Sequence, residues 1–263
     1  MDSAGEPSAV IRRRVDTGNA ELIRDPYAPM SWSLFVNDIA QSYVDFDDPS
    51  RLEFDYTRWI GSVIDAMTEP GRPIRVLHLG GGALTLPRYI EATRPGSVQC
   101  VAEVDARLAA FVDEELPRPG TNVDVVVDDA ARVLAGWPDD DLDLIITDAF
   151  RAARMQEDLA GDVFARHAAR TLRPGGCYIV NVIDTPPYRR WRKLASILTA
   201  SFAEAAVIAG HDREPHPRFD NIVLAASPTP GTLDPERMRA ASLEHETRVA
   251  PAIGPKLAAL LAD

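Results

Sequence analysis

Between residues 74 and 184, short apolar runs alternate with amphipathic stretches. The apolar runs are IRVLHLG, SVQCVAEVD, NVDVVV, LDLIITDAF and CYIVNVID, and the stretch after each one has its apolar residues at helical spacing. Strands that alternate with helices form a mainly parallel sheet with helices on both faces. The sequence therefore predicts an α/β fold, and AEAAVIAG and FDNIVLAAS predict two further strands after the last of these helices.

The first 50 residues follow a different pattern. The segments NAELIRD, SWSLFV and IAQSYVDF are short and alternate in polarity, and Asn37-Asp38 between the last two is a two-residue turn signal. We therefore expect a small antiparallel β-unit ahead of the α/β domain. The expected units are residues 1–50 (a flexible N-terminus and a β-hairpin domain), residues 51–228 (the α/β domain) and residues 229–263 (a C-terminal helical extension).

A helix is expected to connect the two units. Asp48 followed by Pro49 is a capping residue followed by a first-turn proline, and Pro70-Gly71 marks an end. Between these signals, apolar residues such as Trp59 fall on one helical stripe. The pattern predicts a helix that begins at Asp48.

Composition excludes several kinds of partner. The chain has 28 Lys and Arg residues against 40 Asp and Glu residues, a net charge of −12, so we expect neither nucleic acid nor an anionic membrane as a partner. No apolar signal core or membrane-spanning run is present, which predicts a soluble, cytoplasmic protein. Cys100 and Cys177 lie in separate apolar runs and are expected to be buried free thiols, and no metal-ligand spacing occurs.

The most informative local pattern is the triple glycine at residues 80–82, which separates the first strand from the following helix. Glycine permits positive φ and lets a ligand approach the backbone and the helix N-terminus. In open parallel sheets, ligands bind beyond the carboxyl ends of the strands. The Gly-Lys-Ser/Thr pattern of phosphate-binding loops does not follow, so the sequence does not support nucleoside triphosphate hydrolysis.

Acidic residues end the next three strands. Glu103 lies about 20 positions beyond the glycines, where it can accept hydrogen bonds from a ribose diol, whereas Asp105 suits a helix cap. Asp129 could bind the exocyclic amine of an adenine or cap the helix that follows it. Asp148 could accept a proton from a nucleophile or cap a loop. Together these acids and the glycines favour a nucleoside site.

With these features in order, the chain resembles the spermidine synthase (polyamine aminopropyltransferase) family over nearly all of its length. SLFVNDIAQSYVDFDD with LEFDYTRWI is similar to the family's N-terminal β-unit and the helix after it. LHLGGGALT, AEVD, VDDA and ITDAF follow in the family's order, and PHPRFDNIVLAAS resembles its closing strands. The resemblance implies a Rossmann-like, methyltransferase-type domain, mostly parallel with an antiparallel edge, behind a small β-domain. It also implies decarboxylated S-adenosylmethionine as co-substrate and a homodimer or higher homo-oligomer, while the absence of metal-ligand spacing predicts no metal.

The resemblance assigns roles by position. Asp148 matches the family's proton acceptor, and Tyr56 matches a tyrosine beside the amine-binding region. Five positions match contacts to the donor nucleoside: Gln41, Gly80, Gly82, Glu103 and Asp129.

Four positions depart from the family pattern. Ala83 replaces an aspartate that holds the donor's terminal ammonium, a hydrogen bond to a charged group typically worth about 1.5–3 kcal/mol. Arg151 replaces the second acid of an Asp-x-x-Asp motif, and an inward-facing guanidinium would repel a cationic amine. Thr57 replaces a histidine or glutamine, and His216 replaces a tyrosine that lines the amine site. Arg151 and His216 therefore remain candidates on the substrate side.

Three functional hypotheses follow. The first is a divergent aminopropyltransferase that acts on a small-molecule acceptor, with an amine as the first expectation. The second is an S-adenosylmethionine-dependent methyltransferase, because Ala83 removes a repulsion against the carboxylate of that donor and Arg151 could attract it. The third is a non-catalytic ligand-binding or assembly protein that kept the fold.

Overall fold

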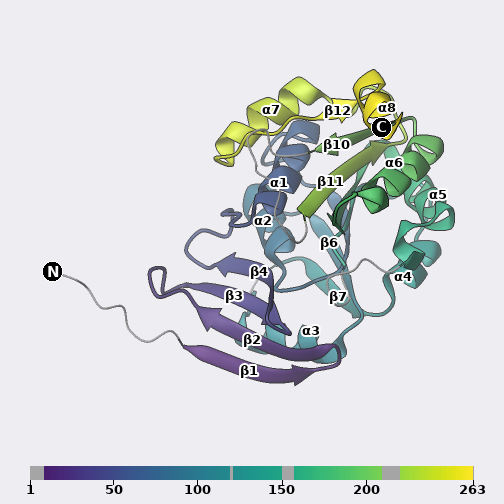
Figure 1. Ribbon diagram of the computed structural model, residues 1–263. Coiled ribbons are helices and arrows are strands. Elements are labelled where there is room, and N and C mark those ends of the chain that lie inside the picture. Colours follow the sequence, from purple (N-terminus) through teal and green to yellow (C-terminus); the bar gives the residue numbers. More distant parts are fainter. Residues whose placement is uncertain (1–8, 119–120, 150–156, 209–219, 263) are drawn as a thin grey trace.

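The computed structural model describes residues 9–118, 121–149, 157–208 and 220–262. These residues form two sheets (Figure 1), a four-stranded one near the N-terminus and an eight-stranded one. The smaller sheet is an antiparallel meander in the order β1-β2-β3-β4. Its strands are β1 (Val10–Val15), β2 (Gly18–Arg24), β3 (Ser31–Val36) and β4 (Ile39–Asp45).

The predicted β-unit is confirmed and is larger than expected. Asn37 and Asp38 join β3 to β4 with φ values of 50° and 64°, the positive angles that a tight hairpin turn requires. Strand β1 was not predicted, because the run of three arginines in VIRRRV conceals the strand pattern. The arginines are tolerated because β1 is an edge strand, and Arg13 ion-pairs with Glu114 and Glu115.

The larger sheet has the strand order β12-β10-β11-β9-β8-β5-β6-β7. Strands β5 to β9 pair in parallel, and β10, β11 and β12 pair antiparallel. The predicted α/β fold with an antiparallel edge is therefore confirmed. The strands are β5 (Arg75–Leu79), β6 (Val98–Glu103), β7 (Val123–Val127), β8 (Leu142–Thr147), β9 (Leu172–Asp184), β10 (Glu204–Ile208), β11 (Asp220–Ser227) and β12 (Ala252–Ile253).

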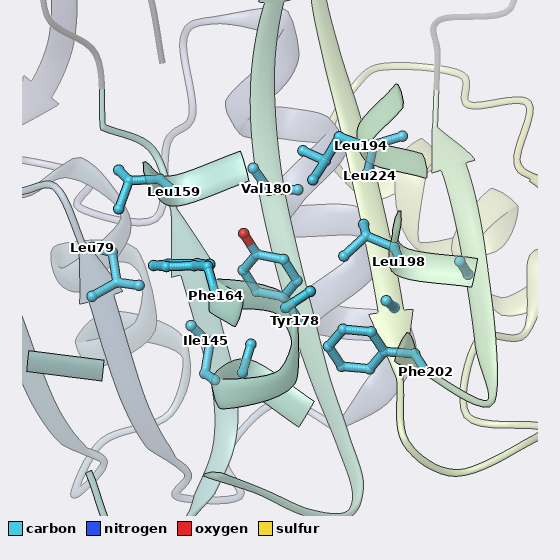
Figure 2. Packing of buried hydrophobic residues seen from close by; sticks show 14 of the residues in the cluster. Leu79, Ile145, Leu159, Phe164, Tyr178, Val180, Leu194, Leu198, Phe202 and Leu224 are labelled. Atoms are coloured by element: carbon cyan, nitrogen blue, oxygen red, sulfur yellow. The ribbon is translucent and has the colours of Figure 1, made fainter. Parts of the chain in front are cut away.

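Helices cover both faces of the larger sheet. One apolar cluster packs the sheet against α1 (Asp55–Met67), α2 (Thr85–Thr93) and α7 (Pro235–Glu244). The other packs it against α4 (Ala130–Gly136), α5 (Asp162–Thr171), α6 (Arg189–Ser201) and α8 (Pro255–Ala262). Figure 2 shows the second cluster, in which Tyr178 stacks on Phe202 with ring centroids 6.0 Å apart and lies tilted against Phe164.

The connecting helix begins later than its capping signal predicts. Helix α1 starts at Asp55, not at Asp48. The Asp45 carboxylate accepts the backbone N–H groups of Asp47 and Asp48, and the Asp48 carboxylate accepts that of Ser50. These local hydrogen bonds stabilise successive turns that compete with helix formation.

The C-terminal extension is not wholly helical, because β12 pairs with β10 at the edge of the larger sheet. Cys100 and Cys177 are free thiols, as predicted, but only Cys177 is fully buried, and Cys100 is partly exposed. Among the described residues, no helix combines the length and apolar character needed to cross a bilayer.

Asp105 holds the two sheets together. Its buried carboxylate caps α3 (Ala106–Glu115) through the Leu108 N–H and accepts three hydrogen bonds from Asp16 and Thr17 in the β1–β2 turn. Burial alone would raise the pKa of Asp105, but these hydrogen bonds outweigh it and lower the pKa. The helix-cap interpretation of Asp105 is therefore confirmed, and the cap also positions the N-terminal sheet.

Candidate functional site

The glycine loop leaves β5 between the ends of β6 and β8. The Gly80 N–H donates to the Ala102 carbonyl, and the Asp148 N–H donates to the Leu79 carbonyl. Gly80 has a φ of 102°, and a Cβ at this position would lie 2.4 Å from the Asp148 carbonyl oxygen. Only glycine lets the loop pass this close to Asp148.

We expect Gly80→Ala to destabilise the protein by about 2–5 kcal/mol, because it adds steric overlap to the strain of positive φ. Gly71→Ala is the matched control, since Gly71 has a φ of 83° but nothing within 4 Å of its Cβ position. Calorimetric unfolding should show a clearly larger loss for Gly80→Ala. Equal losses would mean that close packing against Asp148 contributes nothing.

Glu103 joins the glycine loop to the end of β6. Its Oε2 accepts the Gly81 N–H at 2.9 Å, and its Oε1 accepts the Asp105 N–H at 2.9 Å. Each carboxylate oxygen has a second lone pair, so Glu103 can still accept hydrogen bonds from a ligand. Glu103, Gly81 and Gly82 line a small crevice together with side chains of α3 and with Arg118.

Asp148 directly follows β8 and is held by side chains from two other elements. The Tyr56 hydroxyl of α1 donates to Asp148 Oδ2 at 3.2 Å, and the Asn181 Nδ2 of β9 donates to Asp148 Oδ1 at 3.0 Å. Tyr56 also lies 3.4 Å from the Gln41 carbonyl on β4. The structure therefore brings together Gln41, Tyr56, Gly80 and Asp148, four positions that the sequence selected separately.

Burial dominates the electrostatics of this cluster. Burial raises the pKa of Asp148, and the hydrogen bonds from Asn181 and Tyr56 oppose the rise only in part. Burial also raises the pKa of Tyr56 well above its usual value, and the charge of Asp148 adds to that effect. Within the described part of the chain, both hydrogen-bond partners of the Asp148 carboxylate are neutral.

Ala83 faces the N-terminal sheet. Its side chain is fully buried in the cluster that joins that sheet to α3, and its N–H donates to Ser42 Oγ at 3.0 Å. A Cβ on the neighbouring Gly82 would lie 2.5 Å from the same oxygen. An aspartate at position 83 would place a carboxylate in an apolar cluster, which is costly without a partner. Position 83 therefore contributes to packing between the two sheets.

The remaining sequence-predicted positions divide into two groups. Asp129 ends the β7 segment and caps α4 by accepting the Arg132 N–H at 3.0 Å, which is one of its two predicted roles. The contact of Asp129 with an adenine stays a prediction, and its second carboxylate oxygen is the atom that would accept the hydrogen bond. Arg151 and His216 lie outside the described residues.

Asn181 was missed by the sequence analysis. It is 1% exposed and interrupts the apolar run CYIVNVI of β9. A buried amide needs hydrogen-bond partners, so this interruption was the available signal. In the described ranges, no three His, Cys, Asp or Glu side chains gather where a metal ion could bind.

Solved structures with the same fold identify the relatives of this chain. A probable spermidine synthase from Corynebacterium glutamicum matches 98% of the chain with 95% of its own, at 28% sequence identity and a TM-score of 0.84. The chain is a divergent spermidine synthase-like protein. No protein-family model and no curated protein matches the sequence.

Two more distant structures share the fold of this spermidine synthase-like protein. A spermidine synthase in complex with the transition-state analogue AdoDATO matches 87% of the chain with 78% of its own, at 18% identity and a TM-score of 0.64. Human methyltransferase-like protein 13 in complex with SAH matches 74% of the chain with 91% of its own, at 17% identity and a TM-score of 0.60. The Rossmann-like, methyltransferase-type fold with a small N-terminal β-domain is therefore confirmed.

Proposed function

We propose that this protein is a transferase for an S-adenosylmethionine-type sulfonium nucleoside, and that it moves the aminopropyl group of decarboxylated S-adenosylmethionine to an amine. The observation that carries the proposal is the half-buried Asp148 carboxylate, which borders the glycine loop and has neutral partners among the described residues. A carboxylate in this setting attracts cations. Both substrates of the proposed reaction are cationic.

In the proposed reaction, the ammonium group of the acceptor gives one proton to Asp148. The freed lone pair forms a bond to the carbon beside the sulfonium, the C–S bond breaks, and its electron pair goes to sulfur. The products are an alkylated ammonium and neutral methylthioadenosine, and Asp148 then releases its proton to solvent. A raised pKa suits a carboxylate for this proton transfer.

The nucleoside is proposed to lie against the glycine loop, with Glu103 on the ribose and Asp129 on the adenine. Gln41 is proposed to contact the donor nucleoside as well, and Tyr56, which donates to Asp148, is proposed on the acceptor side. Arg151 and His216 are proposed on the acceptor side by their positions in the sequence alone. Two structural neighbours also support the proposal, because one was solved in complex with AdoDATO and the other in complex with SAH.

Methyl transfer from S-adenosylmethionine is the second candidate. It is favoured by the fold shared with human methyltransferase-like protein 13, a structural neighbour solved in complex with SAH.

Incubation with decarboxylated S-adenosylmethionine and a panel of primary amines is expected to release methylthioadenosine. Calorimetric titration is expected to show tighter binding of the decarboxylated donor than of S-adenosylmethionine. The reverse order of affinity, with S-adenosylhomocysteine as product, would establish the methyltransferase instead. Failure of both donors to bind would leave the non-catalytic hypothesis.

A further inference from the structure

Both partners of Asp148 can either donate or accept a hydrogen bond. The Tyr56 hydroxyl lies 3.2 Å from Asp148 Oδ2 and 3.4 Å from the Gln41 carbonyl, so it can donate to either. The Asn181 amide presents Nδ2 to Asp148 Oδ1. In the described part of the chain, Tyr56 is the only titratable side chain within hydrogen-bond distance of Asp148, and the glycine loop approaches it with backbone alone.

One polar atom of the Asn181 side chain lacks a hydrogen-bond partner in the described structure. Its Oδ1 is buried and has no hydrogen-bond partner among the described residues. An apolar side chain would fill this position on β9 without that cost, as Val180 and Val182 do on either side. Packing therefore does not explain an asparagine here.

We propose that Asn181 is a positioning residue that supports Asp148 in both of its protonation states. When Asp148 is ionised, Asn181 Nδ2 donates to it. When Asp148 is protonated, a half-turn of the amide presents Oδ1, which accepts the carboxyl proton in a hydrogen bond within the same volume. The inference rests on the proposed function, in which Asp148 gains and loses a proton in every turnover.

Tyr56 does not have to change. When the carboxyl proton lies on Oδ1 and faces Asn181, Oδ2 is still an acceptor, and the tyrosine hydroxyl continues to donate to it. Each protonation state of Asp148 then has a complete set of partners, and none of them has to change its charge.

The test is the titration of the Asp148 carboxyl by carbon-13 NMR in the free protein, with Asp148→Asn to assign the signal. Asn181→Leu keeps the side-chain branching and removes both polar atoms. The hydrogen bond from Nδ2 to the ionised carboxylate is charge-assisted and therefore stronger than the bond that Oδ1 accepts from the neutral carboxyl, so Asp148 is expected to titrate at higher pH in this variant than in the wild type. Ser227→Ala is the control, since it removes another buried hydrogen bond, to the Gly176 carbonyl, and is expected to leave the titration unchanged.

An unchanged Asp148 titration in folded Asn181→Leu would overturn the proposal, and Asn181→Ala takes its place if Asn181→Leu does not fold. In the active enzyme, kcat of Asn181→Leu is expected to fall by about 10–100-fold with little change in the KM for the amine. A wild-type kcat in that variant would also overturn the proposal. The titration needs neither donor nor acceptor, so a wild type that releases no methylthioadenosine would refute the proposed function without touching this result.

Discussion

Replacement of Asp148 by asparagine is expected to lower kcat by about 10²–10⁴-fold, the usual contribution of a general base. The variant is also expected to unfold at a higher temperature than the wild type. Asparagine matches the shape of aspartate, so the glycine loop and the partners on α1 and β9 can keep their places. The measurements are steady-state kinetics with decarboxylated S-adenosylmethionine and calorimetric unfolding.

The sign of the stability change follows from the pKa of Asp148. Because burial raises that pKa, the folded protein holds the proton more tightly than the unfolded chain does. The contribution of Asp148 to stability is therefore full below the ordinary aspartate pKa and is lost as the pH rises through the raised value. At neutral pH the ionised group destabilises the fold, and a neutral amide removes that cost. For the same reason, kcat/KM of the wild type is expected to fall as the pH drops through the raised pKa.

Asp124→Asn is the matched control for Asp148→Asn. Asp124 is an exposed acid on β7, so the same change of charge there should alter neither rate nor stability appreciably. If Asp148→Asn keeps the wild-type rate, Asp148 is not the proton acceptor. If it unfolds at a lower temperature, the carboxylate stabilises the fold and the burial argument is wrong.

Replacement of Asp65 by alanine is expected to cost about 3–5 kcal/mol, as the loss of one partner from a buried ion pair does. Arg94 is 0% exposed and donates to Asp65 Oδ1 at 2.8 Å. Asp65 Oδ2 lies 2.7 Å from the Tyr89 hydroxyl and 2.8 Å from His245 Nε2. Without Asp65, the described structure leaves the buried guanidinium with no carboxylate partner. The midpoint of thermal unfolding should fall by roughly 6–20 °C.

A double substitution distinguishes the contribution of the ion pair to stability from that of the packing around it. Asp65→Ala combined with Arg94→Met is expected to recover much of the loss, because an apolar side chain replaces an unpaired buried charge. Asp113→Ala is the control, since the Asp113 side chain is 69% exposed in its ion pair with Arg118 and its loss should cost less than about 1 kcal/mol. A loss for Asp65→Ala as small as that for Asp113→Ala would contradict the prediction.

The same cluster predicts sensitivity to acid. Burial by itself would raise the pKa of Asp65, but hydrogen bonds from His245, Tyr89 and Arg94 outweigh it and lower the pKa. The contribution of Asp65 to stability is therefore present above the ordinary aspartate pKa and is lost as the pH falls through the lowered value. The stability of Asp65→Asn should depend less on pH in that acidic range.

Hydrophobic pattern was sufficient to predict most of the fold. Buried strands such as LDLIIT and the turn at Asn37-Asp38 have local signals that the tertiary structure reinforces. The failures occurred where local chemistry competes with that pattern. Arg13 of β1 has its partners 101 and 102 residues away, and the turns around Asp45 displace a helix start.

The site was predictable at the strand ends and not elsewhere. Asp148 and Glu103 stand where a parallel sheet places ligand contacts, so position alone selects them. Asn181 lies inside a strand, and its importance depends on the register that sets β9 beside β8. Ala83 was selected from the sequence as part of the ligand site, but only the structure shows that its methyl group packs against another sheet.

The contact of Ser42 with Gly82 and Ala83 also has a consequence for fragments that lack the N-terminal sheet. A fragment that starts at residue 51 would keep every element of the larger sheet, yet it would open the apolar flank of the glycine loop to water. The domain that contains the larger sheet is therefore not a self-sufficient module. Shortening the chain from its N-terminus should abolish ligand recognition well before it reaches the first glycine.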